Sequence, residues 1–159
     1  MMVRAHRIPA IVAFFTVLAC VPVRSAQPDI YPSTKQAKSD LAAALAASAA
    51  SHKRVLLDFG GNWCTDCLVL DRYLHDSVNM SLLDANYVLV HVNVGRLTDN
   101  LDIAERYQIR LRKGVPALAV LDEHGELLYS QRTGEFEAMR GMQSSAVTEF
   151  LVRWIPPSA

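Results

Sequence analysis

Two cysteines separated by two residues, Cys64 and Cys67, are the part of this 159-residue sequence most suited to chemistry. A helical pattern begins at Cys64 and carries Leu70 and Leu74 on one side. A thiolate at a helix N-terminus faces unpaired backbone N–H groups and the positive end of the helix dipole, and both lower the pKa of a cysteine thiol. We therefore predict that Cys64 is a nucleophile and that Cys67, one turn further on, attacks the mixed disulfide that Cys64 forms.

Two other uses of the cysteine pair stay open at this stage. A zinc site normally needs four ligands, and only a favourable fold would bring His75 and His91 to complete one. Haem attachment requires a histidine directly after the second cysteine, where Leu68 stands instead. A static structural disulfide is the remaining interpretation, although a domain of this size does not depend on one.

The N-terminal residues 1–25 have the pattern of a secretory signal. Arg4 and Arg7 precede residues 8–23, a run without charge that is shorter than the ~20 apolar residues needed to span a bilayer. Small residues follow, and we expect cleavage after Ser25 or Ala26. The pattern predicts an exported protein, and an uncleaved membrane anchor is the alternative.

Removal of this segment changes the charge and cysteine counts. The chain has 16 Lys and Arg residues against 16 Asp and Glu residues, and cleavage would remove Arg4, Arg7 and Arg24, leaving 13 against 16, a net charge of −3. Neither balance indicates a nucleic-acid partner. Cys20 would leave too, or would carry a lipid anchor, since Val17-Leu18-Ala19-Cys20 loosely matches a bacterial lipidation motif.

The remaining sequence divides into a proline-containing tether over 26–38 and one folded domain over 39–155. Apolar periodicity and turn residues predict helices and strands in alternation. The predicted elements are a helix over 40–51, a strand over 55–59, the helix from Cys64, a helical turn over 81–86, a strand over 87–94, a helix capped by Asp99 or Asn100, a hairpin of strands 117–121 and 126–132, and a helix over 139–154. Because helices link the first three strands, we expect these three strands to pair in parallel, with the hairpin adding an antiparallel edge.

The motifs and their order resemble the thioredoxin superfamily over residues 40–154. Asp58 precedes Cys64 by six positions, as the family's buried aspartate does, and Trp63 directly precedes the cysteine. The strand with His91 is similar to a thioredoxin strand that carries a lysine at this place. The resemblance implies a three-layer α/β/α sandwich around a central mixed sheet of about four strands. Exported bacterial proteins with a Trp-Cys-x-Asp-Cys site look most similar.

The resemblance also implies roles for the residues that match family motifs. Asp58 would be a buried proton acceptor for Cys67. Four positions would contact substrate. They are Trp63 beside the nucleophile, the Val115 backbone, Pro116 as a cis-proline, and Gly134 in the substrate groove.

The family's activity is thiol–disulfide exchange without a cofactor or metal. The expected function is therefore reduction of protein disulfides in the bacterial periplasm. The implied partners are a disulfide-containing protein substrate and a membrane or soluble thiol–disulfide electron donor. The alternative is a thioredoxin-fold metal or assembly chaperone that uses the cysteines as ligands.

Three residues depart from thioredoxin and are expected to tune the site. Thr65 and Asp66 stand between the cysteines, where thioredoxin has Gly-Pro. A carboxylate beside Cys64 disfavours its thiolate, which points to a reductant. His91 in place of lysine makes the surroundings of Asp58 sensitive to pH.

Overall fold

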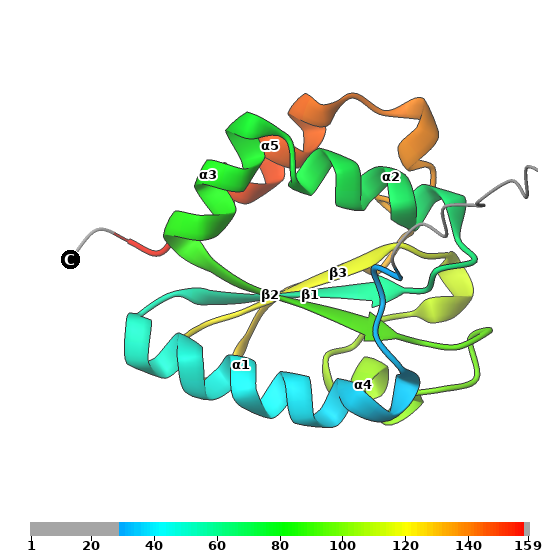
Figure 1. Ribbon diagram of the computed structural model, residues 1–159, viewed down its shortest axis with the longest axis horizontal. Coiled ribbons are helices and arrows are strands. Elements are labelled where there is room, and N and C mark those ends of the chain that lie inside the picture. Colours follow the sequence, from blue (N-terminus) through cyan, green and yellow to red (C-terminus); the bar gives the residue numbers. More distant parts are fainter. Residues whose placement is uncertain (1–28, 158–159) are drawn as a thin grey trace, which may run out of the picture.

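The computed structural model describes residues 29–157 of the chain. The predicted signal, residues 1–25, and the lipidation candidate Cys20 lie outside the described residues. Helices, short 3₁₀ helices (η) and strands follow one another along the described part (Figure 1). They are η1 Thr34–Gln36, α1 Ala37–Ser51, β1 Arg54–Gly60, α2 Thr65–Leu74, α3 Ser77–Asn86, β2 Tyr87–Asn93, α4 Leu101–Arg106, η2 Leu111–Lys113, β3 Ala117–Leu121, β4 Leu127–Ser130, η3 Met139–Gly141 and α5 Ser144–Arg153.

A mixed sheet with the strand order β2-β1-β3-β4 forms the centre of the domain. β1 pairs in parallel with β2 and antiparallel with β3, and β4 completes the hairpin with β3. The expectation of a parallel β3 is therefore wrong. α4 has six residues and spans only about 9 Å, whereas the seven residues of β2 extend about 23 Å. Because α4 is too short to return the chain along β2, β3 starts where β2 ends and runs the opposite way.

Helices cover both faces of the sheet and give the molecule three layers (Figure 1). α1 and α4 lie on one face, and α2, α3 and α5 lie on the other. Alternate residues of β1 enter separate apolar cores, since Val55 and Leu57 pack on the α1 side and Leu56 packs on the α2 side. The predicted three-layer sandwich with four strands is confirmed.

The segment expected to be a tether over 26–38 differs from that expectation wherever the structure describes it. Within residues 29–38, the side chains of Tyr31 and Ala37 are each only 1% exposed, and Asn62 bonds the Tyr31 backbone. α1 begins at Ala37, three residues before the predicted start at Asp40. A buried tyrosine fixes this stretch, so it belongs to the folded domain.

The closing helix is shorter than the apolar spacing predicts. α5 begins at Ser144, and Met139–Gly141 form the separate η3. Met142 and Gln143 have extended backbone, with ψ of 166° and 154°, and they interrupt the helix. Met139 is nevertheless fully buried, which explains why its position fits the helical pattern. None of the helices over residues 29–157 is long and apolar enough to cross a membrane.

Candidate active site

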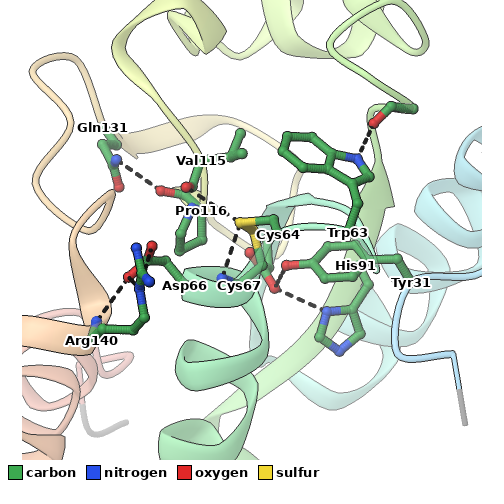
Figure 2. The surroundings of a disulfide bond; sticks show 12 residues. Tyr31, Trp63, Cys64, Asp66, Cys67, His91, Val115, Pro116, Gln131 and Arg140 are labelled. Atoms are coloured by element: carbon green, nitrogen blue, oxygen red, sulfur yellow. Dashed lines mark hydrogen bonds and ion pairs between the residues drawn. A yellow bond between two sulfur atoms is a disulfide. The ribbon is translucent and has the colours of Figure 1, made fainter. Parts of the chain in front are cut away.

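Cys64 and Cys67 form a disulfide at the start of α2, with their Cα atoms 5.2 Å apart (Figure 2). Cys64 is the N-cap residue of α2, and its Sγ accepts a hydrogen bond from the Cys67 backbone N–H at 3.1 Å. A negative charge on the reduced Cys64 sulfur would face this N–H and the positive end of the helix dipole. Cys64 is 7% exposed and Cys67 is fully buried, so an incoming disulfide meets Cys64 first.

Asp58 is fully buried in β1, and two side chains meet its Oδ2 atom. The Tyr31 hydroxyl donates a hydrogen bond to this oxygen at 2.6 Å, and His91 Nδ1 lies 3.0 Å from it (Figure 2). The β1–β2 register sets His91 directly opposite Asp58, whereas Tyr31 comes from the N-terminal segment. Within residues 29–157 the other carboxylate oxygen, Oδ1, is buried and has no hydrogen-bond partner.

The surroundings of Asp58 change the proton affinity of both partners. Burial is the largest factor that raises the pKa of Tyr31 well above its usual value, and the charge of Asp58 raises it further. Burial also opposes a charged His91, but the hydrogen bond to Asp58 and the charges of Asp58 and Asp71 outweigh it and raise the pKa of His91. Tyr31 therefore stays protonated as a donor, and His91 takes up a proton at higher pH than a free histidine.

Gly60 lets the Tyr31 hydroxyl and the Cys67 sulfur approach the same stretch of backbone. A Cβ atom on Gly60 would lie 2.5 Å from the Tyr31 hydroxyl oxygen and 2.8 Å from Cys67 Sγ. Such contacts are too short for any side chain, so glycine is required here. The phenol thus lies beside the buried cysteine.

Trp63 lies next to Cys64 and is 41% exposed, a large apolar surface beside the nucleophile. Its indole Nε1 donates a hydrogen bond to the Gly95 carbonyl oxygen, and the Arg96 guanidinium lies 5.2 Å from its ring centroid. The loop after β2 therefore fixes the orientation of the indole. The structure thus places Trp63 beside Cys64, and its contact with substrate stays a prediction.

The peptide bond between Val115 and Pro116 is cis, and this loop faces the disulfide. The Val115 carbonyl oxygen lies 3.5 Å from Cys64 Sγ. The buried Gln131 side chain, which is 2% exposed, stabilises this loop through two hydrogen bonds. Its Nε2 donates to the Pro116 carbonyl oxygen at 3.1 Å, and its Oε1 accepts from the Leu118 N–H at 3.2 Å. The structure thus brings Val115 and Pro116 to the site as predicted.

Gly134 lies close to the backbone of Lys113, three residues before the cis-proline. Its φ is +83°, and a Cβ there would lie 2.6 Å from the Lys113 carbonyl oxygen. Glycine at this position allows the chain to lie close to the segment that precedes the cis-proline.

The two tuning residues between the cysteines have different surroundings. Thr65 is an exposed first residue of α2. Asp66 is bound by Arg140 of η3 and is not a free carboxylate beside Cys64 (Figure 2). Arg140 adds a counter-charge that the sequence analysis does not include, and the effect of Asp66 on the Cys64 thiolate stays a prediction.

Three residues of the site were missed by sequence reasoning, namely Tyr31, Gln131 and Arg140. Tyr31 stands alone in a proline-containing stretch, where no periodicity signals burial. Gln131 could have been found from the sequence, because it is a polar residue that interrupts an apolar strand pattern. Arg140 had no comparable signal, because its partner Asp66 lies 74 positions away.

The alternative of a metal site requires further ligands near the cysteines. Among the described residues, no group of three or more His, Cys, Asp or Glu side chains is placed to hold a metal ion. His91, one of the two histidines considered for zinc, contacts Asp58. His75 lies at the far end of α2, where its Nδ1 is 2.8 Å from the Asp71 carbonyl oxygen.

A disulfide at a helix N-terminus that faces a cis-proline loop, with its first cysteine 7% exposed, can exchange with a disulfide of another molecule. The fold and the site together define a thioredoxin-fold thiol–disulfide oxidoreductase. A family model described as Thioredoxin-like matches residues 36–123, more than half of the sequence. The chain belongs to this thioredoxin-like family.

Solved structures share this fold. A disulphide isomerase from Xylella fastidiosa Temecula1 is 32% identical with a TM-score of 0.76, and the alignment covers 80% of this chain and 98% of that chain. A DsbH oxidoreductase is 23% identical (TM-score 0.52, covering 71% and 81%), and a thioredoxin from Thermus thermophilus is 20% identical (TM-score 0.52, covering 77% and 83%). These two more distant structures support the fold alone. No curated protein sequence matches the chain.

Proposed function

We propose that this protein is an exported thiol–disulfide oxidoreductase that reduces protein disulfides in a bacterial periplasm. The observation that carries the proposal is the contrast between the two sulfurs of one disulfide. Cys64, the N-cap residue of α2, keeps 7% of its surface exposed, whereas Cys67 is fully buried. This arrangement suits a nucleophile followed by a resolving thiol.

The reaction proceeds in two exchanges. The Cys64 thiolate attacks a substrate disulfide, forms a mixed disulfide and releases one substrate thiolate. Cys67 then loses its proton to a base, for which the buried Asp58 is the candidate, and its thiolate attacks Cys64 Sγ. The Cys64–Cys67 disulfide forms, the second substrate thiolate leaves and takes up a proton, and two electrons have passed to the substrate.

The substrate would approach over Trp63 and the cis-proline loop. The exposed indole supplies apolar contact area, and the Val115 backbone offers polar groups to an extended segment of the substrate. The oxidised pair must be reset by an electron donor, either a membrane protein or a soluble dithiol. Export rests on the signal pattern of residues 1–25.

A second candidate activity is disulfide isomerisation. It is favoured by the 32% identity to a protein described as a disulphide isomerase. An isomerase needs the same attack by Cys64, but the mixed disulfide is resolved by another thiol of the substrate.

Cysteine variants separate the two activities. We expect the wild-type protein to reduce insulin disulfides with dithiothreitol as donor, and both Cys64→Ser and Cys67→Ser to lose this activity. Refolding of ribonuclease with scrambled disulfides tests isomerisation, which Cys67→Ser should retain if that candidate is correct. Absence of insulin reduction by the wild-type protein would contradict the proposal.

A further inference from the structure

We propose that the N-terminal segment around Tyr31 is a working part of the redox site, in which Tyr31 and His91 hold one oxygen of Asp58 and leave the other to take the proton of Cys67. The inference rests on the proposed function, because it concerns the step in which Cys67 resolves the mixed disulfide. Tyr31 and His91 are positioning residues in this role, since they act through Asp58.

The geometry of the three side chains supports a fixed carboxylate. Both contacts, 2.6 Å from Tyr31 and 3.0 Å from His91, end on Oδ2, and the Tyr31 ring packs edge-on against the imidazole with centroids 5.0 Å apart. The two contacts therefore fix the orientation of the carboxyl group, and its Oδ1 has no competing partner among residues 29–157.

Tyr31 also lies beside the group that must lose its proton. Its hydroxyl oxygen and Cys67 Sγ both lie against Gly60, as the short distances from a Cβ at this position show. The phenol therefore links Asp58 to the immediate surroundings of Cys67. Tyr31 is buried among the same apolar residues as both cysteines.

The backbone around Tyr31 is anchored by asparagine side chains of the domain. Asn62 accepts from the Tyr31 N–H at 2.9 Å and donates to the Tyr31 carbonyl oxygen at 2.8 Å. Asn93 donates to the Pro32 carbonyl oxygen, and Asn100 donates to that of Thr34. Since Asn62 stands two residues before Cys64, the loop that carries the nucleophile also holds the segment in place.

Other titratable groups face this cluster from the neighbouring helices. Asp71 of α2 has its Oδ1 3.7 Å from His91 Nε2, and Asp40 of α1 lines the same surface hollow as His91. His91 is partly exposed, with 16% of its side chain accessible. In the proposed step Cys67 gives its proton to Asp58 Oδ1 as the disulfide forms, and the proton then leaves toward solvent on the His91 side.

Oxidation of the reduced protein by dithiobis(nitrobenzoate) tests the inference, because it releases one coloured thiolate at each exchange. The first phase reports the attack by Cys64, and the second reports the attack by Cys67. Each protein is expressed from the full chain with Cys20→Ser, so that Cys64 and Cys67 are the only thiols. Stopped-flow rates are compared between pH 5 and 9 for Tyr31→Phe and for the control Tyr87→Phe. The control also removes a buried hydroxyl, but one that donates to Leu151 in the other core.

Tyr31→Phe removes a hydrogen bond to a charged group, so we expect the ratio of the second rate to the first to fall about tenfold at pH 7. The second phase should recover about one pH unit higher than in the wild-type protein, and Tyr87→Phe should behave as wild type. Asp58→Asn should slow the second phase, and adding Tyr31→Phe to it should slow that phase no further.

An unchanged second phase in Tyr31→Phe at every pH would overturn the inference while leaving the proposed function intact. Equal slowing by Tyr31→Phe in the wild-type and Asp58→Asn backgrounds would also overturn it, since Tyr31 would then not act through Asp58. Absence of a first phase in the wild-type protein would instead contradict the proposed function.

Discussion

Arg140 binds Asp66 through both its backbone and its side chain. The Arg140 N–H donates to Asp66 Oδ1 at 2.9 Å, and Arg140 Nε lies 3.2 and 3.1 Å from the two carboxylate oxygens. Burial raises the pKa of Asp66, but the hydrogen bonds and charge of Arg140 outweigh it, so the pKa is lowered. η3 thus supplies a counter-charge to the dipeptide between the two cysteines.

We predict that substitutions of Arg140 and Asp66 shift the reduction potential of the Cys64–Cys67 disulfide in opposite directions. Arg140→Gln leaves the Asp66 charge uncompensated near Cys64, disfavours the thiolate and should make the potential lower. Asp66→Asn leaves the arginine charge and should make the potential higher. Because exposed ion pairs contribute up to about 1 kcal/mol, we expect shifts of roughly 10–20 mV in each direction. Equilibration with glutathione buffers measures both variants, and shifts of the same sign would contradict the explanation.

Trp63 is expected to contribute more to the reaction with protein substrates than to the reaction with small disulfides. Trp63→Ala removes a half-exposed apolar surface beside Cys64 and should lower kcat/KM for insulin about tenfold. Its rate with oxidised glutathione should change little, because a small disulfide does not need that surface. Trp154→Phe is the control, since Trp154 lies at the end of α5 and packs on Tyr129. Equal losses for both substrates would argue against a docking role.

Gln131 is expected to stabilise the cis-proline loop. Gln131→Met keeps a similar volume but leaves the Leu118 N–H and the Pro116 carbonyl oxygen without their buried partners. We expect the free energy of unfolding to fall by about 2 kcal/mol. Urea unfolding measures this against Gln143→Met, since the Gln143 side chain makes no capping bond to α5. An equal loss in the two variants would show that the buried bonds are unimportant.

His91 should make the stability of the oxidised protein depend on pH. Because its pKa is raised in the folded state, the folded protein binds a proton more tightly than the unfolded chain does. The stabilisation is complete below the unfolded value of about 6.5 and is lost as pH rises through the folded pKa.

Urea unfolding at pH 6 and pH 8 measures this effect. The wild-type protein should lose more stability over this interval than His91→Gln does. The exposed His124→Gln variant should keep the wild-type slope. The same slope in all three proteins would show that His91 does not carry the effect.

The order of helices and strands could be predicted because each element has a local apolar pattern. The valine-rich pattern of β2 and the short apolar run of β1 can be recognised without information from distant residues. The cysteine pair marks the start of α2. The resemblance to thioredoxin motifs also implied that Asp58, His91 and Pro116 lie at one site. Strand direction was less accessible, since it depends on whether α4 is long enough to return the chain.

The parts that sequence reasoning missed are held by polar contacts between residues that are far apart in the sequence. Tyr31 meets Asp58 across 27 positions and Asn62 across 31, and a lone tyrosine gives no periodic signal. Asn100, predicted with Asp99 as a possible cap, is the N-cap residue of α4, but its side chain makes no capping bond and donates instead to the carbonyl oxygens of Thr34 and Asn93. Such contacts depend on tertiary structure, which local patterns do not encode.

The reduction potential of the Cys64–Cys67 pair tests the proposed direction of electron flow most directly. The protein is equilibrated in graded glutathione and dithiothreitol buffers, and its thiols are counted by alkylation. We predict a two-electron transition close to the thioredoxin value of ~−270 mV, as befits a reductase. A transition near ~−120 mV would make the protein an oxidant, and the lack of any transition would contradict a redox function for the pair.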